Sequence, residues 1–209
     1  MNILIFGSTG GTGRALVEQA LAQGHTVTAF ARTPAKLAIR HPQLRIVQGD
    51  VMDFAAVRQV MPGHEAVLSA LGAPATEKVA VRSEGTRHIL AAMAAAGVGR
   101  FVCLTTLGMG DSQAALPFSY KYLIVPLFLR HAFADSELQE SLIRQSPLAW
   151  TIARPATLTN GARTGVYRHG FPATEKGLKI KISRADVADF MLKQLHDVTY
   201  LRKAASLSY

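Results

Sequence analysis

The sequence predicts an α/β fold: one domain with a parallel sheet that is doubly wound, with helices on both faces. Strand patterns alternate with helical patterns from the first residues to about residue 106, as in α/β proteins. A glycine-spaced turn joins the first expected strand to the first expected helix. The length of 209 residues suits one such domain, and no linker or internal repeat divides residues 1–209.

Strands are expected where short apolar or β-branched runs meet turn signals, and helices where apolar residues recur at helical spacing. The expected strands are Ile3–Phe6, His25–Ala31, Arg45–Asp50, Ala66–Leu71, Phe101–Thr106, one beginning at Trp150–Ala153, and a short one at Val166–Gly170. The expected helices are Arg14–Gln23, Phe54–Met61, Val81–Ala96, Asp135–Gln145 and Ala185–Leu195, the last capped by Ser183.

The apolar segment Phe118–Phe133 interrupts this alternation. It is broken by Pro126 and carries Lys121, Arg130 and His131. Three interpretations stay open: a pair of helices that pack in the core, a lid over a flat substrate, or a patch for a partner or a membrane surface.

The composition excludes several classes of protein. Hydrophobic residues make up 49% and charged residues 18%, which is typical of a globular and not a disordered chain. The one cysteine, Cys103, lies in an apolar run, so we expect a buried residue, no disulfide and a reducing, cytoplasmic location. No apolar run reaches the roughly 18 residues of a membrane span, and the N-terminus has no signal-peptide pattern.

The net charge of +9 raises the question of nucleic-acid binding. No helix-turn-helix, RNA-binding or zinc pattern accompanies the charge, so we expect no nucleic-acid partner. An anionic cofactor with a small anionic substrate explains the same excess. The seven histidines do not cluster at ligand spacings, which predicts no metal site, and we expect a monomer or a weak dimer.

The segment GSTGGTG, from Gly7 to Gly13, is typical of a dinucleotide-binding turn between a strand and a helix. Gly7 lets the strand end turn tightly, Gly10 lets the backbone approach a pyrophosphate, and Gly13 lets the helix pack close to the strand. The free N–H groups near Thr12 then face the phosphate charge.

The second expected strand indicates which dinucleotide binds. In NAD-binding versions of this motif an acidic residue follows that strand and bonds the ribose hydroxyls. Here Arg32 holds the place and Lys36 follows one turn on, which favours the 2′-phosphate of NADP(H) over the alternative of a solvated basic turn. Asp50 is expected to bond the adenine amino group, to cap the helix near Asp53, or both. The stretch Leu71–Ala73 lies where open α/β sheets hold ligands.

The motifs GSTGGTG, FART, GD, SALG, SEGTRHILAAM, TT and WTIARP together resemble the atypical short-chain dehydrogenases with an NAD(P)-binding, NmrA-like domain. Within that group the chain is most similar to the biliverdin-IXβ reductase/flavin reductase family. The resemblance implies a single-domain Rossmann-like reductase in which NADPH reduces flavins, as substrates, or linear tetrapyrroles. By matching position it implies a pyrophosphate site at Gly7, Thr9, Gly10, Gly11, Thr12 and Gly13, a 2′-phosphate site at Arg32 and Lys36, an adenine site at Asp50 and Val51, and a nicotinamide site at Leu71, Gly72 and Ala73.

Two positions depart from the family pattern. Thr106 stands where the family commonly has a serine, and Thr157 stands where it has a histidine. These two threonines are our candidate catalytic residues on the acceptor side. Thr105 is expected either to orient the nicotinamide or the acceptor, or to cap the strand end.

Ordinary short-chain dehydrogenases use a Tyr-x-x-x-Lys pair to donate a proton, and Tyr120 and Tyr122 are followed by Ile124 and Pro126 at the lysine position. The missing pair argues against alcohol–ketone chemistry. It leaves a reaction that depends on holding two planar rings face to face. The alternative function is a non-enzymatic NADP(H)-binding redox sensor or assembly factor.

Overall fold

The computed structural model describes residues 1–74 and 79–209. Its strands are β1 (Asn2–Phe6), β2 (Thr26–Ala31), β3 (Leu44–Gln48), β4 (Ala66–Ser69), β5 (Arg100–Leu104), β6 (Ala149–Pro155), β7 (Thr157–Thr159), β8 (Arg168–His169), β9 (Lys181–Ser183) and β10 (Lys203–Ser208). Its helices are α1 (Gly11–Ala22), α2 (Phe54–Val60), α3 (Val81–Ala96), α4 (Arg130–Gln145) and α5 (Arg184–Lys193), with 3₁₀ turns η1 (Pro34–Lys36) and η2 (Gly110–Ala115) and a π-helix η3 (Tyr120–Leu129).

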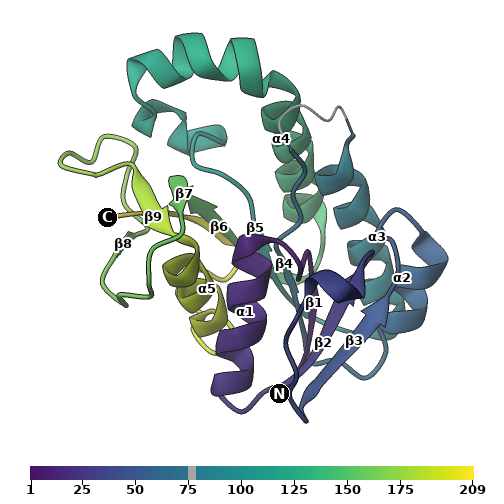
Figure 1. The fold of residues 1–209 in the computed structure, drawn as a ribbon. Coiled ribbons are helices and arrows are strands. Elements are labelled where there is room, and N and C mark those ends of the chain that lie inside the picture. The colour runs from purple at the N-terminus through teal and green to yellow at the C-terminus, as the bar shows by residue number, and fades with distance from the viewer. Residues whose placement is uncertain (75–78) are drawn as a thin grey trace.

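An eight-stranded sheet in the order β3-β2-β1-β4-β5-β6-β10-β8 forms the centre of the molecule (Figure 1). Its neighbouring strands run parallel, apart from β8, which is antiparallel to β10. A separate small sheet pairs β7 with β9. The strand order reverses between β1 and β4, and open α/β sheets bind ligands at the carboxyl ends of the strands at such a point.

Helices α1 and α5 pack on one face of the sheet, and α2, α3 and α4 cover the other (Figure 1). Because successive side chains of a strand point to opposite faces, β1 contributes to both cores. Ile3 and Ile5 pack with α1 and α5, whereas Leu4 and Phe6 pack with α2 and α3, and all four are fully buried. The doubly wound parallel sheet predicted from the sequence is confirmed.

Helix ends follow the local signals. Helix α3 spans Val81–Ala96 as predicted and ends at Gly97, whose φ of +70° is a left-handed conformation that suits glycine. Ser183 caps α5, accepting a hydrogen bond from the Asp186 N–H at 2.9 Å. Helix α4 begins at Arg130 and not at Asp135, because it continues directly from η3. Strand β3 ends at Gln48 and not at Asp50.

Strand β10, Lys203–Ser208, is absent from the sequence-based prediction. Its alanines and serines have little preference for strands, yet it pairs with β6 inside the sheet and its last four residues are buried. The strand expected at Val166–Gly170 shortens to β8, Arg168–His169, which pairs with β10. Pairing between segments that are distant in the sequence therefore determines both β10 and β8.

The segment Phe118–Phe133 is not a buried helix pair, so that interpretation is wrong. Its central residues form the π-helix η3, which has no buried residue and arches over the top of the molecule as a teal ribbon (Figure 1). Pro126 lies inside η3; proline lacks an N–H and its ring clashes with a carbonyl of the preceding turn in an α-helix, which disfavours a regular α-helix here. Among the described residues no helix is long and apolar enough to cross a bilayer.

Candidate functional site

A cavity of about 630 Å³ lies at the carboxyl ends of the parallel strands. The glycine turn after β1, the end of β2, the loop after β4, the end of β5 and the start of α4 all contribute to its wall. The sequence-predicted residues that line it are Gly7, Thr9, Gly10, Gly11, Thr12, Arg32, Lys36, Val51, Leu71, Gly72, Ala73, Thr105 and Thr106. Gly13, Asp50 and Thr157 lie outside its lining.

The glycine turn brings three backbone segments into contact. Gly7 has a φ of +71°, and a Cβ there would overlap the carbonyl oxygen of Ala70, in the loop after β4. A Cβ on Gly13 would overlap the backbone of Gly7, so Gly13 keeps α1 against β1 although it does not line the cavity. The Gly10 N–H donates to the Gly7 carbonyl at 3.0 Å. Side chains at Gly7 or Gly13 are therefore incompatible with this turn.

The first turn of α1 is open to an anion. Gly10 is its N-cap; no described side chain caps the helix there, and the first turn holds no acidic residue. Unpaired N–H groups at a helix start, together with the helix dipole, attract phosphate.

Arg184, the first residue of α5, adds a positive charge beside this turn. It lines the cavity and packs so closely over Gly11 that a Cβ on Gly11 would come within 2.5 Å of Arg184 Cδ. Its Nη1 donates to Asn160 Oδ1 at 2.6 Å, which fixes the side chain. Sequence reasoning missed Arg184 because only the folded chain brings α5 to the glycine turn, so no local signal exists.

The end of β2 supplies two exposed cations. Arg32 follows the strand, Lys36 lies in η1, and both line the cavity. The chain there is anchored by the buried Leu37, and the Arg32 carbonyl accepts a hydrogen bond from Gln48 Nε2 at 3.4 Å. The predicted pair of cations thus lies together at the open edge of the cleft.

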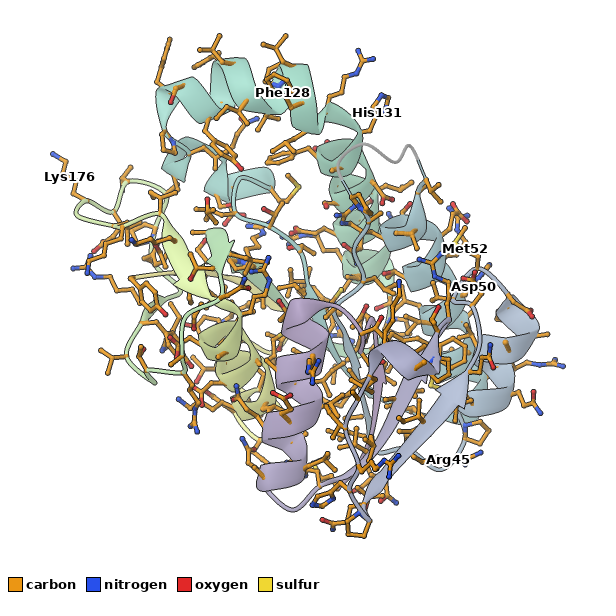
Figure 2. All side chains as sticks on the ribbon, in the orientation of Figure 1. Arg45, Asp50, Met52, Phe128, His131 and Lys176 are labelled. Carbon is orange, nitrogen blue, oxygen red and sulfur yellow. The ribbon has the colours of Figure 1, made fainter. Side chains whose placement is uncertain are left out.

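Next to these cations the wall is apolar and suits an adenine ring. Phe30 and Val51 line it, and a Cβ on Gly49 would overlap the Phe30 ring. Asp50 lies beside this wall, and its Oδ1 accepts a hydrogen bond from the Met52 N–H at 2.9 Å (Figure 2). Asp53 caps α2, so the helix-cap interpretation of Asp50 is wrong, while its contact with adenine stays a prediction.

Thr105, at the end of β5, belongs to a buried network. Its Oγ1 donates to Glu140 Oε1 at 2.8 Å, not to the strand end. Glu140 pairs in a bidentate manner with Arg154, through Nε at 2.9 Å and Nη2 at 2.6 Å, and Arg154 Nη1 donates to Asp111 Oδ1 at 2.6 Å. Because Thr105 donates its one hydroxyl proton to Glu140, it can act only as an acceptor of a hydrogen bond from a ligand in the cleft.

The charges of this network stabilise one another. Burial by itself lowers the pKa of Arg154, which is 1% exposed, but the hydrogen bonds to Glu140 and Asp111 outweigh burial and raise its pKa above the ordinary value. The hydrogen bond from Arg154 lowers the pKa of Asp111. Sequence reasoning missed Glu140 and Arg154; the available signal was a charged residue, Arg154, at the end of a strand whose other residues are uncharged.

A second cavity of about 270 Å³ adjoins the first and shares Thr105, Thr106, Tyr120, Leu158 and Arg184 with it. Thr157 lines only this second cavity, so the structure brings the two candidate threonines to one space.

The inner side of residues 118–129, called the arch below, faces the larger cavity. Tyr120 and Leu129 of η3 and Phe133 of α4 line it, which is the arrangement that the lid interpretation requires. Thr106 Oγ1 makes only a long contact, 3.4 Å, to the Leu107 carbonyl.

Cys103, in β5, is a core residue as predicted. It is fully buried, and burial raises the pKa of its thiol. The thiol therefore stays protonated at neutral pH and is no nucleophile. Among the described residues, histidine, cysteine and acidic side chains form no group of three that could hold a metal ion.

A model of the NAD(P)H-binding protein family matches residues 7–198 of this chain. The chain belongs to this family of NmrA-like, atypical short-chain dehydrogenases. The family relation read from the sequence motifs is confirmed, and the matched range includes every predicted site residue.

Two curated relatives show how widely function varies among similar proteins. The photosystem II assembly factor Ycf39 of Synechocystis is 32% identical over 111 residues, which are 51% of this chain and 34% of the relative. A (4-alkanoyl-5-oxo-2,5-dihydrofuran-3-yl)methyl phosphate reductase of Streptomyces griseus is 30% identical over 155 residues, 74% of this chain and 47% of the relative. The chain thus spans between a third and a half of the length of these relatives.

Among solved structures, ChuY, an anaerobilin reductase of Escherichia coli O157:H7, superposes with a TM-score of 0.80 at 24% identity. The match covers 99% of this chain and 96% of ChuY. At this identity the likeness establishes the Rossmann-like fold over the whole described chain.

Proposed function

We propose that the protein is an NADPH-dependent reductase that transfers hydride to flavins (FMN, FAD, riboflavin), biliverdin-like linear tetrapyrroles, or both. One observation carries the proposal. A single cleft runs from the glycine turn and the cations after β2 to an acceptor half lined by threonines and apolar side chains. A dinucleotide donor and a planar acceptor both need a place in such a cleft.

The donor half fits NADP(H) on its own geometry. Gly7 and Gly13 let the turn pack tightly against Ala70 and let α1 pack against β1. Gly10 would let the backbone approach a pyrophosphate, and Arg184 supplies charge beside it. Arg32 and Lys36 would hold the 2′-phosphate, because a guanidinium forks onto phosphate oxygens. When bound, NADPH supplies the hydride and, with a proton from solvent, completes a two-electron reduction.

On the acceptor side, residues of the chain would bind the acceptor and orient it and the nicotinamide. Thr105, whose proton is held by Glu140, would accept a hydrogen bond from the nicotinamide amide. Tyr120 and Phe133 line the cavity and would stack on a planar acceptor, to which Thr106 and Thr157 would offer their hydroxyls. Because no Tyr-x-x-x-Lys pair is present at Tyr120 or Tyr122, the reaction relies on the proximity of two rings.

An anionic acceptor agrees with the net charge of +9 and with two relatives. The Streptomyces relative reduces a phosphate ester, and ChuY is an anaerobilin reductase. These names support a negatively charged, conjugated acceptor and leave its identity to experiment.

The experiment is to measure NADPH consumption with FMN, FAD or biliverdin as the acceptor, and to repeat each assay with NADH in place of NADPH. We expect turnover with at least one acceptor and a preference for NADPH. A second candidate, a non-enzymatic NADP(H)-binding assembly factor, is favoured by the similarity to Ycf39. Tight NADPH binding without turnover of any acceptor would support that candidate and refute the reductase.

The acceptor half is tested by Thr106→Ala and Thr157→Ala. If both hydroxyls contact the acceptor, each variant should raise KM or lower kcat by about ten-fold with unchanged NADPH affinity. Rates that match the parent in both variants would place the acceptor elsewhere.

A further inference from the structure

The outward side of the arch formed by residues 118–129 is apolar and exposed. Its exposed fractions are 77% for Phe118, 68% for Leu127 and 70% for Phe128, and Tyr122 and Leu123 are more than half exposed. Figure 2 shows Phe128 and His131 at the end of the molecule opposite Arg45. Single exposed apolar residues are ordinary, but a contiguous group of them marks an interaction surface.

The same segment is positively charged. Residues 112–134 contain no aspartate or glutamate, whereas Lys121 and Arg130 bracket the exposed Leu127 and Phe128, and His131 follows them. Both cations lie outside the cavity lining, so the cofactor does not account for them. Their partner must combine an apolar interior with negative charge at its surface.

We propose that this arch docks the protein on an anionic lipid bilayer. Leu127, Phe128 and Phe118 would enter the interface, and Lys121 and Arg130 would reach the head-group phosphates from the rim. A second copy of the chain fits this face poorly, because a symmetric contact brings the same cations of both copies together. The arch lies on the bilayer and does not span it, since no described helix is long and apolar enough to cross.

Docking also places the acceptor cavity at the bilayer, because Tyr120 and Leu129 of the same arch line that cavity. The inference does not depend on the proposed reductase activity, since it concerns side chains that line neither of the two cavities.

The test is sedimentation of the whole protein with vesicles of phosphatidylcholine alone or with about 30% phosphatidylglycerol, an anionic surface of the kind that attracts basic segments. We expect binding to the anionic vesicles, at least about ten-fold weaker binding to the neutral ones, and weakening by salt. The double variant Leu127→Asp/Phe128→Asp should lose at least about ten-fold in affinity. Lys121→Gln and Arg130→Gln should each lose about five-fold, the equivalent of one cation at an anionic surface.

Matched controls separate the arch from the general positive charge. Val166→Asp/Val198→Asp changes two apolar residues that are 80% and 74% exposed elsewhere on the surface, and Arg45→Gln removes a cation at the opposite end. Both controls should bind vesicles like the parent. Leu127 and Phe128 line neither cavity, so NADPH affinity and the circular dichroism spectrum should stay unchanged and show that the variants fold.

Three results overturn the inference. The first is no binding to either vesicle, and the second is equal loss in the arch variants and the controls. The third is a parent protein that does not bind vesicles but forms a dimer, seen by light scattering, which the double variant Leu127→Asp/Phe128→Asp dissociates. That result would assign the face to a second copy.

Discussion

The two halves of the cleft are built in different ways. The glycine turn of the donor half is bounded by main chain: Gly7 lies against Ala70, and Gly13 lies against Gly7, with no room for a Cβ. The acceptor half is bounded by side chains such as Phe133 of α4 and Tyr120 of the arch, whose π-helix has no buried residue. The donor half is therefore fixed by backbone geometry, whereas the acceptor half can change with a few surface substitutions.

One buried ion pair joins helix α4, which continues from the arch, to the strand ends at the cleft. Glu140 lies on this helix, and it binds both Thr105 of the cleft and Arg154 at the end of β6. The loop before the arch is tied to the same arginine through Asp111. If the Glu140–Arg154 pair at this junction is broken, we expect the arch to shift relative to the cleft, whereas the glycine turn keeps its structure.

Among the variants that test this difference between the two halves, Glu140→Ala should have the largest effect. It leaves the Arg154 guanidinium buried without its bidentate partner, and removing one member of a buried pair costs about 3–5 kcal/mol. We expect a loss of that size in the free energy of unfolding, measured with denaturant. Glu137→Ala, on the exposed side of the same helix, should change it by less than about 0.5 kcal/mol. Equal stability of the two variants would show that the pair does not hold the junction.

Gly13→Ala tests the donor half directly. The added methyl group overlaps the backbone of Gly7, so α1 must move away from β1, at a cost of about 1–3 kcal/mol. NADPH affinity, followed by fluorescence titration, should fall together with stability. Gly99→Ala is the matched control, since a Cβ there meets no atom within 4 Å. A Gly13 variant that binds and unfolds like this control would mean that the turn is not tightly packed.

Two arginines separate cofactor choice from cofactor binding. Arg32→Asp should weaken NADPH binding by about 10–100-fold and NADH binding little, because we propose that Arg32 holds the 2′-phosphate, which NADH lacks. Arg184→Ala, which removes charge beside the pyrophosphate turn, should weaken both dinucleotides alike. Titration of each variant with each dinucleotide gives the four values. Equal loss of both cofactors in Arg32→Asp would exclude it as the 2′-phosphate clamp.

The same contrast explains how far the sequence could be interpreted. A tight turn depends on neighbouring residues, so the turn Gly7–Gly13, the place of Arg32 at the cleft and the helix Val81–Ala96 were predictable from local patterns. The cofactor contacts of these residues stay predictions. The Glu140–Arg154 pair, the place of Arg184 and the strand β10 arise from contacts between distant segments, which no local pattern encodes. The arch was misjudged in part because an apolar segment looks the same whether it is buried or exposed.

Asp111→Asn gives the smallest expected effect and tests the loop end of the junction by pH. The bond from Arg154 lowers the pKa of Asp111 below its ordinary value of 3.8, so its contribution to stability is present above that value and is lost as pH falls through the lower, folded value. Because the carboxylate is 85% exposed, the parent should exceed the variant by less than about 1 kcal/mol at about pH 7. Denaturant unfolding should show this difference shrinking as pH falls below 3.8. A difference that persists in acid would mean that Asp111 acts through packing and not through its charge.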